Sequence, residues 1–210
     1  MGTDPTGMKV TIDETTLEDG TIVLNVTITA ALIVDQDMTK EEEQTLADTI
    51  KEGIDSYLSG SGTLDDGTKV VMSTNLVWTN VDDPSGFDPN SDHIIDITTI
   101  KNPDGGVAPV DGMVDQIGGM VMSLNLPFIT DNMQPNRNTG RVAAHEMGHN
   151  LGLEHEHNPP SNLMHEVNKG GSDLTPAQMI QIYKNYKNGD LNKWNYWDYK
   201  KTMESQGEKK

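Results

Sequence analysis

The stretch His145-Glu146-Met147-Gly148-His149-Asn150-Leu151-Gly152-Leu153-Glu154-His155 decides how the rest of the chain is interpreted. Its histidines and glutamate follow the spacing H-E-x-x-H-x-x-G-x-x-H. Residues four apart lie on the same face of a helix, so His145 and His149 can direct both imidazoles at one metal ion. Gly152 can adopt the left-handed conformation that ends a helix, and the turned chain then brings His155 to the same ion.

Three imidazole ligands leave a fourth zinc position open to water, as in catalytic rather than structural zinc sites. Zinc lowers the pKa of that water toward about 7. Glu146 is placed to accept the water proton and later pass it to the leaving group. The run therefore predicts one catalytic Zn²⁺ held by His145, His149 and His155, with Glu146 as general base and acid. Nitrogen ligands alone would also admit cobalt or nickel.

The shorter pattern H-E-x-x-H also arises by chance, as two solvated histidines on a surface helix, whereas the added glycine and third histidine favour a metal site. The complete run resembles the long zinc motif of the metzincin clan of endopeptidases. The segment Asn162-Leu163-Met164 that follows is similar to the metzincin Met-turn, which implies that Met164 lies beneath the metal as an apolar floor. Some metzincins carry a tyrosine just beyond that methionine. Here His165 follows, and either His165 or His157 is available to hydrogen-bond a reaction intermediate.

Hydrophobic periodicity predicts a fold of five strands and three main helices. Thr39 and Glu42 form a capping box at the start of the first helix, and Pro176 suits the first turn of the last one. The strands are expected at 21–34, 68–79, 93–100, 106–110 and 118–125, and the helices at 39–58, across the zinc motif, and from about 175 onward.

The order of these elements is similar to a metzincin catalytic domain of the matrixin type, in which a strand that starts with Gly-Gly precedes the zinc helix, as Gly118-Gly119 does here. The expected fold class is α+β, a zincin domain with a twisted five-stranded mixed sheet, three main helices, an active-site helix and a Met-turn.

The domain is expected to span 20–188, and 189–210 to form a partly disordered polar tail with an aromatic cluster. Residues 1–19 are expected to be an expression remnant or a flexible lead, although 8–20 also suits a first edge segment. A shielding propeptide over 8–38 is a further alternative, and its strand-like pattern favours the sheet instead.

The chain is strongly acidic, with 33 Asp and Glu against 15 Lys and Arg and a formal net charge of −18. Such a surface argues against nucleic acid as a partner, because that binding depends on cations that neutralise phosphates. No run approaches the roughly 18 apolar residues of a membrane span. With no cysteine among these 210 residues, they can form no disulfide and offer no thiolate ligand, and a thiol switch over the zinc is not expected.

A second metal site is one hypothesis for the acidic loop before residue 93. Asp88, Asn90 and Asp92 copy the opening of an EF-hand loop, but His93 stands where glycine is required and Thr99 where glutamate is required. The sequence therefore leaves two interpretations open, a weak Ca²⁺ loop and a plain acidic turn.

These observations predict a zinc-dependent endopeptidase that hydrolyses peptide bonds with a zinc-activated water. A protein or peptide substrate is expected to bind in extended form along an edge strand, assigned to 106–110, by β-augmentation. Residues 165–174 are expected to line the pocket for the side chain after the scissile bond. The family tendency implies a secreted, extracellular protein, and a monomer is expected. The alternative is a protease-like binding module, of the toxin or adhesin kind, with weak or no hydrolysis.

Overall fold

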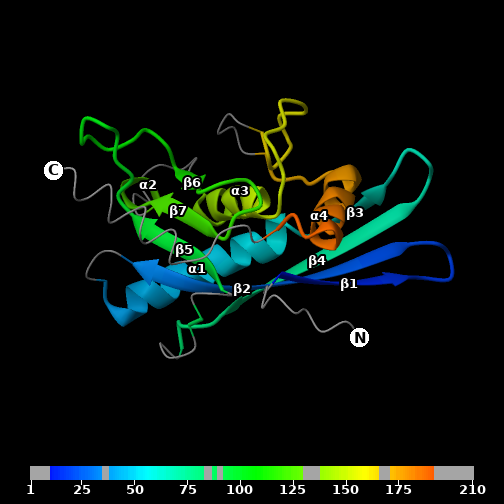
Figure 1. The fold of residues 1–210 in the computed structure, drawn as a ribbon, viewed down its shortest axis with the longest axis horizontal. Helices are drawn as coiled ribbons and strands as arrows, with labels where there is room; N and C mark the ends of the chain where they lie inside the picture. Colours follow the sequence, from blue (N-terminus) through cyan, green and yellow to red (C-terminus); the bar gives the residue numbers. More distant parts are fainter. Residues whose placement is uncertain are drawn as a thin grey trace.

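The computed structural model describes residues 10–34, 38–82, 87–88, 92–129, 138–165 and 171–191. Over these ranges the chain forms one mixed sheet of seven strands and four helices (Figure 1). The strands are β1 (Val10–Thr16), β2 (Ile22–Val34), β3 (Gly60–Thr63), β4 (Lys69–Trp78), β5 (His93–Thr98), β6 (Gly112–Val114) and β7 (Val121–Asn125). The helices are α1 (Lys40–Tyr57), α2 (Leu126–Ile129), α3 (Thr139–Asn150) and α4 (Pro176–Asn188).

Strand β2 is the centre of the sheet, whose order is β3-β4-β2-β5-β7-β6. One edge of β2 pairs in parallel with β4. Its other edge pairs antiparallel with β1 along the first half and in parallel with β5 along the second half. Alternate residues of β2, among them Leu24, Val26 and Ile28, are buried against the helices. This alternation is the period-two pattern that marks a strand with one face on a core.

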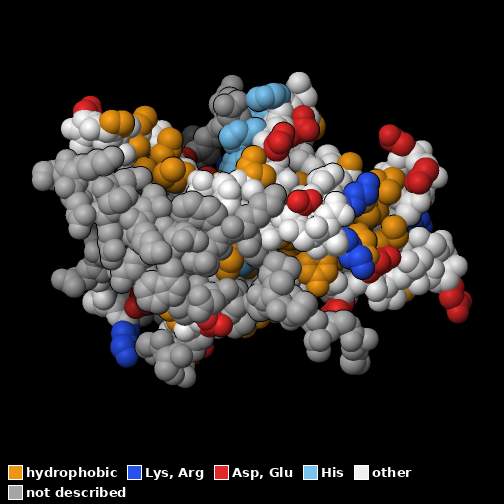
Figure 2. All heavy atoms as spheres, viewed as in Figure 1, with side chains coloured by type: hydrophobic (Ala, Val, Ile, Leu, Met, Phe, Trp, Pro, Cys, Tyr) orange, Lys and Arg blue, Asp and Glu red, His pale blue; other side chains and the backbone are white. Residues whose placement is uncertain are grey.

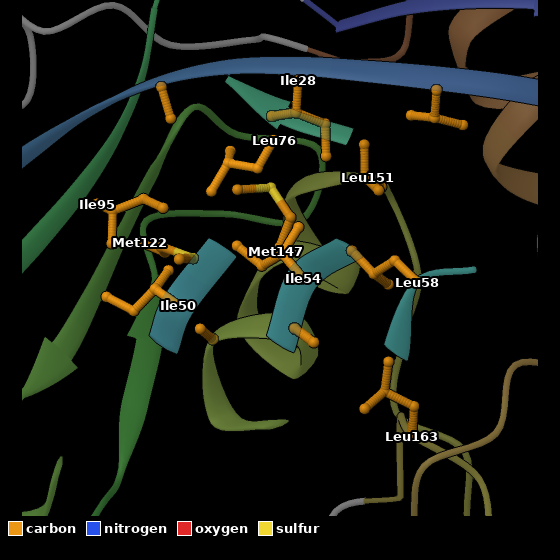
Figure 3. Packing of buried hydrophobic residues seen from close by; sticks show 14 of the residues in the cluster. Ile28, Ile50, Ile54, Leu58, Leu76, Ile95, Met122, Met147, Leu151 and Leu163 are labelled. Atoms are coloured by element: carbon orange, nitrogen blue, oxygen red, sulfur yellow. The ribbon is translucent and has the colours of Figure 1, made fainter. Parts of the chain in front are cut away.

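Helices α1 and α3 pack against each other and supply much of the core. The capping box forms at the start of α1, since Glu42 N donates to Thr39 Oγ1 and Thr39 N donates to the Glu42 carboxylate. Figure 3 shows Ile50 and Ile54 of α1 among Met147 and other buried residues of the core.

The two helices approach closely where a glycine of α1 faces a glycine of α3. A Cβ built on Gly53 would lie 2.2 Å from Gly140 Cα, and one on Gly140 would lie 2.9 Å from Gly53 Cα. The crossing therefore has no room for any side chain at Gly53, and α1 fixes the position of the zinc-motif helix.

The sheet has seven strands, two more than the five that the sequence predicts. The first is β1, so Val10–Thr16 is an edge segment paired with β2 and not a flexible lead. Its apolar signal is weak because only its first half is buried. The second is β3, a Gly-Ser-Gly-Thr segment that follows α1 and has no apolar alternation to predict a strand. It pairs with β4 and lies under α4, where a Cβ on Gly62 would be 2.4 Å from Pro176 Cγ.

The prediction of the edge strand beside the zinc motif is also wrong. Residues 106–110 form a loop with a single bridge between Lys101 and Val107, and the strand at the end of the sheet is β6, Gly112–Val114. The buried Asn125 side chain explains the loop. Its Nδ2 donates to Ala108 O at 2.9 Å and to Val110 O at 2.8 Å, and its Oδ1 accepts from Ile100 N at 3.0 Å. These bonds consume backbone groups that a strand would have paired with its neighbour.

Residues 1–9 of the expected N-terminal remnant or lead (1–19) and residues 192–210 of the expected tail (189–210) lie outside the described residues. Within the described ranges no helix is both long and apolar enough to cross a membrane.

Candidate metal centre

Helix α3 and the turn after it carry the zinc motif. Asn138 caps the helix, its Oδ1 accepting from Arg141 N at 2.9 Å. The helix ends at Asn150, and Gly152 has a φ of +83°, the left-handed conformation that the motif predicts. Gly152 N donates to His149 O at 2.9 Å and Leu153 N donates to Gly148 O at 3.0 Å, which turns the chain back toward the helix.

This turn brings the three histidines of the motif together. The potential ligand atoms of His145, His149 and His155 all lie within 4.8 Å of one another. The Nε2 atoms of His149 and His155 are 3.2 Å apart. Two nitrogens at zinc–nitrogen distances in a tetrahedral site are separated by about 3.3 Å. Figure 2 shows histidine side chains gathered at the surface in the region of α3.

The other ring nitrogens of two of these histidines contact backbone carbonyls. His145 Nδ1 lies 2.8 Å from Leu163 O, and His149 Nδ1 lies 2.7 Å from Leu153 O. A carbonyl oxygen only accepts, so each Nδ1 carries the hydrogen and each Nε2 keeps a lone pair. Such a backbone acceptor on the far nitrogen is the usual support of a metal-binding histidine. The donor set therefore fits a zinc ion.

Burial favours the neutral form of the same two imidazoles in the metal-free site. It lowers the pKa of His145 to about 4, and it also lowers the pKa of His149. A neutral imidazole is the form that binds metal. His155 is exposed and completes the group from the loop.

Glu146 lies on the buried side of the same helix, 7% exposed. A Cβ on Gly112 of β6 would be 2.8 Å from Glu146 Cγ and 3.0 Å from its Oε1, so the edge strand packs directly on this side chain. Burial raises the pKa of Glu146 to about 8, and the charge of Asp111 adds to the rise. A cation bound by the neighbouring histidines would favour the carboxylate. Neither Gly112 nor Asp111 was expected at the site, because an Asp-Gly pair ordinarily indicates a turn.

Met164 is buried below α3. A Cβ on Gly148 would lie 2.5 Å from Met164 Sδ, so the absence of a side chain at Gly148 makes room for the thioether. Met164 N donates to Asn162 Oδ1 at 2.8 Å, and Glu156 N donates to Met164 O at 2.8 Å. The methionine side chain thus packs against α3 at Gly148, while its role as the Met-turn residue stays a prediction.

The two further histidines occupy different environments. His165 is half-buried directly after Met164, and its N donates to Asn162 O at 3.1 Å, whereas His157 is exposed. A role for either in binding a reaction intermediate stays a prediction. Of the pocket expected at 165–174, residues 166–170 lie outside the described ranges.

The calcium hypothesis gains no support. The Asp92 carboxylate accepts from Asp88 N at 2.8 Å, as in an ordinary turn, and Asn90 lies outside the described residues. Across the described parts of the chain, the three histidines are the only group of three or more metal-binding side chains.

The mixed sheet, the helix and the three-histidine group together define a zinc metallopeptidase of the metzincin type. The model of the matrixin peptidase family matches residues 15–187, and the chain belongs to this family. The archaemetzincin of Methanopyrus kandleri, a solved structure, is similar with 17% identity and a TM-score of 0.47, over 77% of this chain and 96% of that chain. No curated protein matches the sequence.

Proposed function

We propose that the protein is an endopeptidase in which Glu146 is the general base and acid. The observation that carries this proposal is the contact between Glu146 and Gly112. It joins the buried carboxyl group, which is adjacent in sequence to His145, to the last strand of the sheet. A peptide that lies along that strand would pass next to both the carboxylate and the histidines.

Strand β6 is suited to receive such a peptide. One of its edges pairs with β7, in the register Gly112 with Leu124 and Val114 with Met122, and β6 ends the sheet among the described strands. Its other edge is therefore available for β-augmentation, in which main-chain hydrogen bonds supply affinity and alternate side chains supply specificity. This proposal moves the substrate edge from 106–110 to Gly112–Val114.

His145, His149 and His155 would hold the catalytic zinc ion, which when bound supplies a Lewis acid that polarises the scissile carbonyl and lowers the pKa of a water molecule. The Glu146 carboxylate takes the proton of the attacking water and delivers it to the leaving amine nitrogen. Burial keeps this carboxylate away from bulk water, so a proton held at its oxygens is retained for the second step. His165 or His157 would hydrogen-bond the developing negative charge on the substrate oxygen.

A peptide-library assay with the Glu146→Gln variant tests the proposal. The amide keeps the size of the side chain but neither accepts nor delivers a proton. We expect normal zinc content and a loss of hydrolysis of about 10²- to 10⁴-fold, and we expect a chelator to abolish cleavage by the wild type. Full activity of the variant would refute the role of Glu146. Peptide binding by the wild type without cleavage would instead favour a protease-like binding module.

We further propose that the protein acts outside the cell and as a monomer. This proposal rests on the tendency of its family. Detection of the protein in culture supernatant and its mass in solution test these two points. Retention inside the cells, or a dimer at micromolar concentration, would contradict them.

A further inference from the structure

Helix α4 presents two amide side chains toward the metal centre. Gln178 and Asn185 are seven residues apart, which is about two turns, so they lie on the same face of the helix. Gln178 is half-buried and Asn185 is 8% exposed. Each amide bonds to a different piece of chain near the histidines.

Gln178 is paired with Asn162 through both amide groups. Asn162 Nδ2 donates to Gln178 Oε1 at 2.8 Å, and Gln178 Nε2 donates to Asn162 Oδ1 at 3.2 Å. The same Asn162 Oδ1 accepts from Met164 N at 2.8 Å. Residue Leu163 lies between these anchored neighbours, and its carbonyl oxygen is the acceptor for His145 Nδ1. The amide pair therefore fixes the carbonyl that orients His145.

Asn185 anchors the turn at the end of α3. Its Nδ2 donates to Leu151 O at 3.2 Å and to Gly152 O at 3.1 Å, and its Oδ1 accepts from Gln181 Nε2 at 2.6 Å. The next residue along the chain is Leu153, whose carbonyl oxygen is the acceptor for His149 Nδ1. A Cβ on Gly152 would lie 2.2 Å from Asn185 Nδ2, so the turn and the amide are in direct contact.

We propose that Gln178 and Asn185 are positioning residues of the zinc site, each acting through one histidine. Gln178 holds the Leu163 carbonyl on His145 Nδ1, and Asn185 holds the Leu153 carbonyl on His149 Nδ1. Both imidazoles are thereby kept in the tautomer that leaves Nε2 for the metal. This inference rests on the zinc site proposed above. Loss of such outer partners typically weakens metal affinity about 10- to 100-fold.

The Gln178→Glu variant tests the first half of the proposal. Glutamate also suits the third position of a capping box, so its carboxylate still accepts from Thr175 N and the helix start is kept. A carboxylate has no hydrogen to donate, and it faces Asn162 Oδ1 instead of bonding to it. We expect the zinc Kd, measured by competition with a chromophoric chelator, to rise about 10- to 100-fold.

Ala177→Glu is the matched control, because it places the same added charge one residue away at an exposed position of the same helix. We expect its zinc Kd to stay within about twofold of the wild type, since a surface charge contributes little. An equal rise in both variants would overturn the proposal, because long-range charge would then account for the effect.

The Asn185→Leu variant tests the second half, since leucine has a similar size and cannot donate to the two carbonyls. We expect a loss of zinc affinity of similar size. The two variants act through different histidines, so their effects on log Kd should add in the double variant. If the double variant binds zinc no more weakly than either single variant, the two residues do not act through separate histidines.

The decisive measurement needs no metal. ¹⁵N NMR of imidazole-labelled, zinc-free protein, at a pH above the ordinary histidine pKa of about 6.5, reports which ring nitrogen carries the hydrogen. In the wild type we expect the Nδ1–H form for His145 and His149. Gln178→Glu should disturb only His145, and Asn185→Leu only His149. Unchanged tautomers in both variants, or equal disturbance of both histidines by each variant, would refute the proposal. Failure of the wild type to bind zinc, with these tautomers intact, would refute the proposed function instead.

Discussion

Gly112 of the edge strand lies so close to Glu146 that a single added methyl group would contact the Glu146 side chain at 2.8 Å from Cγ. The strand that would receive a substrate and the group that would move its protons are thus one contact apart. A substitution of either residue is therefore expected to shift the position of the other.

The Gly112→Ala variant should therefore lose activity without losing metal. The methyl group displaces the Glu146 carboxyl group, and misplacement of a catalytic group by about 1 Å can lower the rate about 10²-fold. The measurement is kcat/KM on a cleaved peptide together with zinc content. Val107→Ala is the control, because that side chain is exposed and lies outside β6. A Gly112→Ala enzyme as active as the Val107→Ala enzyme would show that Glu146 is not held by this contact.

The pH dependence of stability should report the burial of Glu146 in the metal-free protein. Its folded pKa of about 8 exceeds the ordinary 4.5, so the stabilisation by the bound proton is complete below pH 4.5 and is lost as pH rises through 8. Glu146→Gln stays neutral throughout. Relative to that variant, the wild type should lose free energy of unfolding, on the order of a few kcal/mol, between these two pH values.

Urea unfolding of both proteins at a series of pH values measures this difference. The opposite contribution of His145, whose pKa is lowered by burial, is present in both proteins and cancels in the comparison. A difference in unfolding free energy that stays constant from pH 4.5 to 8 would mean that the Glu146 carboxyl group is solvated.

Acid should release the zinc ion, because each imidazole must be neutral to bind it. The affinity is expected to fall as pH is lowered and to collapse near pH 4, where the buried His145 takes up a proton. Zinc retained after dialysis at a series of pH values measures the release. Full occupancy well below pH 4 would contradict binding by these three side chains.

The Gly53→Ala variant should unfold more easily, although alanine is the better helix former by about 1 kcal/mol. The added methyl group would lie 2.2 Å from Gly140 Cα, and backbone cannot move aside as a side chain can. Overpacking of this kind costs about 1–3 kcal/mol, which exceeds the gain in helix propensity. Thermal unfolding measures the effect, with Glu52→Ala, an exposed change on the same helix, as control. A more stable Gly53→Ala protein would show that the two helices can separate at no cost.

The elements that the sequence predicts well are those whose signal is local. The capping box at Thr39, the alternation along β2 and the histidine spacing in α3 each depend on neighbours a few residues away. Strands β3 and β6 lack such a signal. β3 is built of glycine, serine and threonine, and β6 has three residues, so only their pairing with distant strands makes them strands.

The parts of the site that escape prediction are its supports. An asparagine or glutamine in a sequence is ordinarily interpreted as a solvated side chain. Asn125, Asn162 and Asn185 act as anchors only because the fold brings them to carbonyl groups or amides between 15 and 34 residues away. Conversely, the ligand spacing within 145–155 is so strongly constrained by helix geometry that the donor group could be predicted without any tertiary contact.

The order in which the chain is synthesised gives these supports a further consequence. The three histidines leave the ribosome before Asn162, Gln178 and Asn185, which hold the carbonyls behind them. A nascent chain that ends before α4 thus carries every metal ligand but not the groups that orient them. Tight zinc binding, and with it the proposed peptidase activity, would begin only when the last helix is complete.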